Sequence, residues 1–129
     1  MKNLIYWGYA TAWFVVRHLP AKLAYGLARV AADYIYKKNG KQIKRLRSNY
    51  VRVHPELSQS QLEVLVQEGM RSYMRYWCDT FRLPSWSENE IKQTVVVENQ
   101  HFLTDPVDEG RGCVVSLPHA GNWDHAGAY

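Results

Sequence analysis

The chain of 129 residues lacks an apolar run long enough to cross a lipid bilayer. Its first uncharged stretch, residues 3–16, has 14 residues, whereas a helix that spans the hydrocarbon layer needs about 20. The Ala10-Thr11-Ala12 segment imitates a cleavage site, but the apolar stretch before it is too short for a signal peptide. We therefore expect a protein that stays in the cytoplasm or on the cytoplasmic face of the membrane.

Cysteine is scarce, and the chain has no internal repeat and no low-complexity linker. The two cysteines, Cys78 and Cys113, have neither the spacing of a metal-binding pair nor the number needed for a disulfide framework. A metal site built from His119, Asp124 and His125 is disfavoured, because adjacent residues diverge on a helix and no third ligand has a suitable spacing. We expect reduced thiols, no metal and no more than one domain.

Acidic residues are absent between Asp33 and Glu56, where seven basic residues occur. The chain has a formal net charge of +4 and a pI near 9.1, which favours an anionic partner without choosing among membrane, nucleic acid and acidic substrate. No recognisable nucleic-acid module surrounds the basic tract, so we expect no nucleic-acid partner. An aromatic helix followed by lysines favours an anionic membrane surface, although a solvated helix face stays possible. The predicted membrane-binding residues are Trp7, Trp13, Phe14, Lys37, Lys38, Lys41 and Lys44.

Helical patterns cover the first two-thirds of the chain. Residues 1–36 are predicted to be helical with a break near Pro20, and Ser58 with Gln61 and Ser87 with Glu90 have the spacing of capping boxes. Within these predicted helices, two series of apolar residues recur at helical spacing. The first, on one face of the second helix, is Leu23, Leu27, Val30, Ala31 and Tyr34; the second, predicted to be core, is Leu62, Leu65, Val66, Met70, Tyr73, Met74, Trp77 and Phe81.

The period changes in the last third, where we predict an α/β fold. Thr94–Val97 is β-branched, a short helix is expected from Gln100, residues 110–112 form a turn, and Cys113–Leu117 has the apolar character of a buried parallel strand. The predicted architecture is a helical layer that leads into the first strands of a sheet. Its segments are 1–36, membrane-associating helices; 37–92, basic and amphipathic helices; and 93–129, the start of the sheet.

Candidate chemistry follows the second predicted strand. On one continuous helix His119 and Asp124 would point about 140° apart, so they can meet only if His119 lies on a loop and Asp124 in the first turn of the next helix. There the carboxylate would fix the imidazole tautomer, and the other ring nitrogen could accept a proton from a hydroxyl. The spacing alone is common by chance, and a structural histidine is the alternative.

The wider string, Ser116 to Asp124, resembles the catalytic box of the bacterial lipid A biosynthesis (lauroyl/myristoyl) acyltransferase family. Three further segments agree in order, and together they are most similar to the actinobacterial phosphatidylinositol mannoside acyltransferases. These segments are Asn49-Tyr50 with residues 55–58, Arg71–Trp77 with residues 81–84, and Gly110-Arg111-Gly112.

The resemblance implies an acyltransferase with acyl-CoA as co-substrate and no cofactor. His119 would act as general base, Asp124 as its partner, and Gly121, Asn122 and Trp123 would bind substrate. Aspartate at position 124, where lipid A enzymes usually have glutamate, indicates a phosphatidylinositol mannoside as acceptor. It further implies a peripheral protein on the cytoplasmic face of the plasma membrane. A lipid A-type acyltransferase and a non-catalytic membrane-binding fragment are the alternatives.

The resemblance also implies a longer protein. The family's domain runs to more than twice the length of this chain, which stops just past the box. We therefore expect the 129-residue chain to be an N-terminal part without useful activity of its own.

Overall fold

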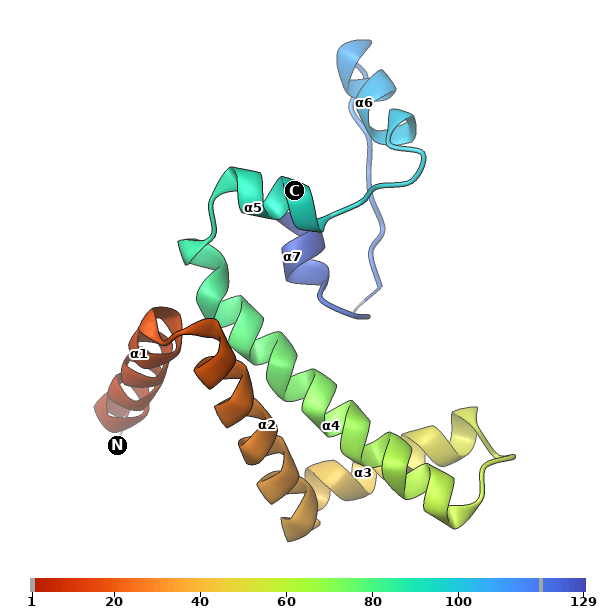
Figure 1. Cartoon of the computed structure of the whole chain (residues 1–129). Helices are drawn as coiled ribbons and strands as arrows, with labels where there is room; N and C mark the ends of the chain where they lie inside the picture. Colours follow the sequence, from red (N-terminus) through yellow and green to blue (C-terminus); the bar gives the residue numbers. More distant parts are fainter. Residues whose placement is uncertain (1, 119) are drawn as a thin grey trace. The chain divides into compact units, whose positions relative to one another are not determined.

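The computed structural model describes the backbone of residues 2–118 and 120–129, and side chains from residue 4 onward except at position 119. The chain divides into two compact units, Met1–Pro84 and Ser85–Tyr129. Over its described residues, the first unit holds four helices: α1 (Lys2–His18), α2 (Ala21–Lys38), α3 (Lys41–Val53) and α4 (Gln59–Arg82) (Figure 1). The second holds α5 (Glu88–Thr94), α6 (His101–Asp108) and α7 (Trp123–Gly127), after a 3-10 turn, Leu83–Ser85, at the boundary. The functional division into 1–36, 37–92 and 93–129 stays a prediction.

The boundaries of the first helices follow from local chemistry, and the predicted break is confirmed. Pro20 has no amide hydrogen and holds an extended ψ of 138°, so α1 ends before it and α2 begins after it. Asn39 ends α2 in the left-handed conformation, with φ of 46°. Gly40 then precedes α3.

The two predicted capping boxes are both present. The Ser58 hydroxyl accepts from the Gln61 amide at 3.4 Å, and the Gln61 side chain accepts from the Ser58 amide at 2.9 Å. Ser87 and Glu90 make the same reciprocal pair at the start of α5. The backbone donation from Ser87 lowers the pKa of the Glu90 carboxyl. These pairs satisfy donors that a helix start leaves open, so α4 and α5 begin where the sequence predicts.

The longest helix, α4, is the centre of the first unit and packs against α1, α2 and α3. Three of its buried residues meet one residue each from α2 and α3 in a small core. The predicted apolar stripe on α4 is confirmed for most of its length, including Met74, which packs against the core. It is wrong at Tyr73, which is 50 % exposed, and at Trp77, which is 37 % exposed. The core residues are Ala32, Ile43, Leu62, Val66 and Met70.

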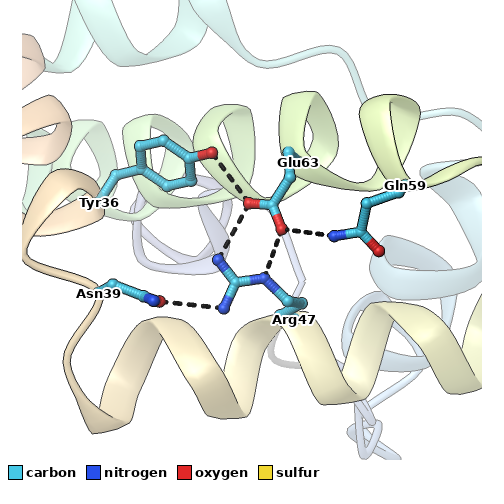
Figure 2. Close-up of polar contacts among 5 residues, drawn as sticks. All are labelled: Tyr36, Asn39, Arg47, Gln59 and Glu63. Carbon is cyan, nitrogen blue, oxygen red and sulfur yellow. Dashed lines mark hydrogen bonds and ion pairs between the residues drawn. The ribbon is translucent and has the colours of Figure 1, made fainter.

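An ion-pair network on one carboxylate ties three helices together (Figure 2). Glu63 of α4 accepts from Nε of Arg47 on α3 at 2.7 Å and from the Tyr36 hydroxyl on α2 at 2.9 Å. Gln59, one turn earlier on α4, donates to the same carboxylate, and Asn39 accepts from Arg47. The hydrogen bond from Arg47 lowers the pKa of Glu63. Arg47, one of the seven basic residues of the tract, therefore stabilises the packing of α3 against α4 and the end of α2.

The predicted α/β sheet is wrong for the part of the chain that the structure describes, in which no strand is found. Residues 95–97 and 113–117 have no regular secondary structure, and neither segment is paired with a neighbouring strand. Val96 is 89 % exposed and Val114 fully exposed. A single extended segment leaves its backbone donors and acceptors unpaired, so β-branched composition alone does not make a strand. The helix predicted from Gln100 is confirmed as α6, and Gly110 and Gly112 follow it with positive φ.

Candidate functional site

The Gly121–Asp124 segment forms the start of α7 in the second unit. Gly121 has φ of 62°, a conformation that residues with a β-carbon rarely adopt. The side-chain oxygen of Asn122 then accepts from the His125 amide at 3.2 Å and caps the helix. The positive φ of Gly121 and the Asn122 cap together set where α7 begins.

Asp124 lies in the first turn of α7, as predicted. Its side chain and that of Trp123 are partly buried, and Gly121 is exposed. His119 lies outside the described residues, so its pairing with Asp124 stays a prediction. The substrate-binding roles of Gly121, Asn122 and Trp123 also stay predictions.

His125 has a structural environment that the sequence did not reveal. Its Nε2 lies 2.9 Å from the Thr94 hydroxyl, and its ring centroid lies 4.7 Å from that of Trp86. These partners precede His125 by 31 and 39 positions along the chain, and no local spacing announces such contacts. His125 therefore fastens α7 to the end of α5. Among the described residues, no group of three His, Cys, Asp or Glu side chains is placed to hold a metal ion.

The predicted membrane-binding aromatics lie on α1. Trp7 is 64 % exposed and Phe14 is 65 % exposed. Trp13 is 43 % exposed, and its indole nitrogen donates to the carbonyl of Phe81 at 3.0 Å, so this ring also holds α1 against α4. Lys37, Lys38, Lys41 and Lys44 are all exposed. Across the described helices, none combines the length and the apolar character that crossing a membrane requires.

The apolar face of α2 is exposed and not packed. Leu23, Leu27, Val30 and Tyr34 recur at helical spacing and are 58–66 % exposed. Large apolar side chains that share one exposed helix face usually mark an interaction surface. The core of the first unit uses the other face of this helix, through Ala32.

A cavity of about 400 Å³ lies between α1 and the end of α4. Next to the lining residue Phe81, Arg82 donates to the carbonyls of Val16 and Leu19 at 2.9 and 2.7 Å. These hydrogen bonds satisfy acceptors at the end of α1. The cavity is lined by Tyr6, Tyr9, Ala10, Trp13, Thr80, Phe81 and Pro84.

Comparison with known proteins assigns the chain to a family. The family model described as bacterial lipid A biosynthesis acyltransferase matches residues 1–129. The chain belongs to this family of acyltransferases. No solved structure matches the chain.

The curated relatives that the chain matches carry a more specific name than the family does. A phosphatidylinositol mannoside acyltransferase of Mycolicibacterium smegmatis is 35 % identical over 122 residues, covering 95 % of this chain and 40 % of the relative. The phosphatidylinositol mannoside acyltransferase of Mycobacterium tuberculosis is 32 % identical over 125 residues, covering 95 % of this chain and 39 % of the relative. The chain thus spans about two-fifths of the length of the curated relatives that it matches.

Proposed function

We propose that the protein is an acyltransferase that moves a fatty acyl group onto a mannose hydroxyl of a phosphatidylinositol mannoside. One observation carries this proposal: relatives named for that activity align over 95 % of the chain at 32–35 % identity. The family match over residues 1–129 supports the broader reaction, acyl transfer to a glycolipid.

The proposed chemistry places His119 and Asp124 at the reacting hydroxyl. His119 takes the proton of the sugar hydroxyl as its oxygen attacks the thioester carbonyl of acyl-CoA. The tetrahedral intermediate then collapses, the carbon–sulfur bond breaks, and the imidazolium returns the proton to the departing thiolate. The products are an ester and free CoA. Asp124, at the start of α7, would hold the imidazole in the tautomer that leaves one ring nitrogen able to accept a proton.

We further propose that the protein works as a peripheral protein on the cytoplasmic face of the plasma membrane. The exposed aromatic residues of α1 and the exposed apolar face of α2 support this placement. The exposed lysines at the end of α2 and the start of α3 provide the second contribution, attraction to anionic headgroups. Both features suit an enzyme whose acceptor is an anionic lipid.

The proposed function is tested by acyl transfer in His119→Ala, with His101→Ala as the matched control. Loss of a general base should lower the rate by at least ~10²-fold, whereas His101, an exposed histidine of α6, should be replaceable. The assay uses the full protein, acyl-CoA and phosphatidylinositol mannoside, with circular dichroism to show that both variants fold. A folded His119→Ala that retains activity would remove this residue from the mechanism.

The acceptor is tested separately, because the matched family is described by lipid A biosynthesis. Wild-type protein is supplied with phosphatidylinositol mannoside and with a glucosamine disaccharide lipid in parallel. We expect acylation of the mannoside. Transfer to the disaccharide alone would support the lipid A-type alternative, and transfer to neither would favour a non-catalytic membrane-binding protein.

A further inference from the structure

A polar pocket of about 460 Å³ lies between α2 and α4, entirely within the first unit. The two helices run side by side and form the most extensive helix pair of that unit (Figure 1). The pocket is rich in arginine and has one acidic residue in its lining. Its polar lining residues are Tyr25, Arg29, Glu68, Arg71, Ser72 and Arg75.

Arg71 forms a fixed wall of this pocket, because three of its five N–H donors are already used. Its Nε and Nη2 donate to the two carboxylate oxygens of Asp33 at 2.7 and 2.9 Å, and its Nη1 donates to Glu68 at 2.5 Å. Gln67 donates to Asp33 as well. Arg71 therefore pairs with both Asp33 and Glu68. Two weaker interactions with carboxylates remain at the other arginines: Asp79 lies 4.0 Å from Nε of Arg75, and the charge of Arg29 helps to lower the pKa of Asp33.

Arg75 and Arg29 have donors available. The Arg75 side chain is 72 % exposed, and its Nε lies 4.0 Å from Asp79, beyond hydrogen-bonding distance. Its guanidinium lies 5.2 Å from the Tyr25 ring centroid, and the Tyr25 hydroxyl already donates to Asp79 at 2.6 Å. Arg29 is exposed and makes neither a hydrogen bond nor an ion pair with any residue that the structure describes.

We propose that this pocket binds a phosphate group through Arg29 and Arg75. The planar guanidinium fork matches the oxygens of a phosphate and forms charge-assisted hydrogen bonds with it. The ring of Tyr25 orients one fork, and the exposed hydroxyl of Ser72 adds a neutral donor to the same lining. The phosphate could belong to a phospholipid headgroup or to a soluble phosphate ester, since both offer the same oxygens. This site does not depend on the proposed acyl transfer.

The test measures binding of inorganic phosphate by calorimetry in Arg29→Gln, Arg75→Gln and the double variant. Arg52→Gln is the matched control for each single variant, because Arg52 is an exposed arginine of α3 outside the pocket and its loss removes the same single charge. Arg45→Gln with Arg52→Gln matches the double variant in the same way. We expect at least ~10-fold weaker binding in the double variant and no more than twofold change in the control. The single variants are measured too, because Arg29 has no contact on which folding depends.

The outcomes separate specific binding from general surface charge. Equal weakening by Arg52→Gln, or no phosphate binding by the wild-type protein in solution or on vesicles, would overturn the proposal. A second arm uses phosphatidylcholine vesicles doped with phosphatidylinositol. If the double variant loses vesicle binding, a lipid headgroup is the source; if it loses only inorganic phosphate binding, a soluble ester is the source. Since neither arm measures acyl transfer, failure here leaves the proposed function untouched.

Discussion

At the scale of single residues, carboxylates that accept hydrogen bonds from other helices stabilise the first unit. Asp79 is buried, with 8 % exposure, and accepts from the Tyr25 hydroxyl. Burial and this hydrogen bond to a carboxylate raise the pKa of Tyr25 to about 12. Asp33 shows the opposite effect, because the hydrogen bonds from Arg71 and then Gln67 lower its pKa from 3.8 to about 2. Both hydrogen-bonded pairs, Tyr25 with Asp79 and Asp33 with Arg71, join α2 to α4.

The lowered pKa of Asp33 predicts an acid-sensitive contribution to stability. A carboxylate with a lower pKa in the folded state stabilises the fold fully above its unfolded pKa, 3.8, and loses that contribution as the pH falls towards about 2. We expect Asp33→Asn to be less stable than wild type near neutral pH and to lose less stability over this acid range. The free energy of unfolding, measured by urea denaturation across the pH range, tests this prediction. Glu98→Gln, an exposed acid, is the control, and identical pH profiles of Asp33→Asn and wild type would contradict the prediction.

At the scale of elements, helices specified by neighbouring residues were predictable and elements specified by distant ones were not. The capping serines accept hydrogen bonds from amides three residues ahead, so Ser58 and Ser87 predict the starts of α4 and α5 from local sequence alone. A strand requires another strand beside it, and no composition of residues 95–97 or 113–117 supplies one. Of the candidate site, the place of Asp124 in a helical first turn was predictable, because it depends on Gly121 and Asn122 next to it. The role of His125 depends on α5 and was missed.

Helix α4 contains a glycine whose replacement should be harmful. A β-carbon at Gly69 would overlap the hydroxyl and ring of Tyr50 on α3, whereas one at Gly26 on α2 would meet open space. Alanine favours a helix by about 1 kcal/mol over glycine, so Gly26→Ala should be stabilising by up to that amount. Gly69→Ala should instead be destabilising, by about 1 kcal/mol or more, because overpacking outweighs the helix preference. Thermal unfolding measures both, and a stabilised Gly69→Ala would show that Tyr50 moves aside freely.

The cap of α4 provides a second prediction at this scale. Ser58→Ala removes the acceptor for the Gln61 amide and should be destabilising by about 1 kcal/mol. Ser48→Ala is the control, because Ser48 is an exposed residue inside α3 without a capping role. Denaturant unfolding of the two variants gives the difference. Equal stability of Ser58→Ala and wild type would mean that water replaces the cap at no cost.

At the scale of the whole molecule, the proposed membrane role predicts two separable kinds of binding energy. Changing Lys37, Lys38, Lys41 and Lys44 to Gln should weaken binding to anionic vesicles and flatten its dependence on salt, at about 1 kcal/mol for each lysine near the surface. Vesicle co-sedimentation over a range of salt concentrations measures this effect. Binding that is unchanged would make these lysines part of a solvated face.

The aromatic contribution should be insensitive to salt. Trp7→Ala with Phe14→Ala should weaken binding equally at low and high salt, because the lost term is apolar burial. Phe102→Ala is the control, since Phe102 of α6 is equally exposed, at 70 %, but belongs to the second unit. Co-sedimentation of the variants with the same vesicles measures the change. An equal loss from Phe102→Ala would mean that any exposed aromatic ring suffices.

The central place of α4 in the first unit has a consequence for synthesis. Three of the five core residues, Leu62, Val66 and Met70, belong to α4, which is the last of the four helices to leave the ribosome. Until then, α2 and α3 have neither the apolar partner for Ala32 and Ile43 nor the carboxylate for Arg47. The nascent chain therefore exposes its aromatic first helix before any core exists. Cotranslational folding of this unit must be a late event, completed only once residue 82 has been made.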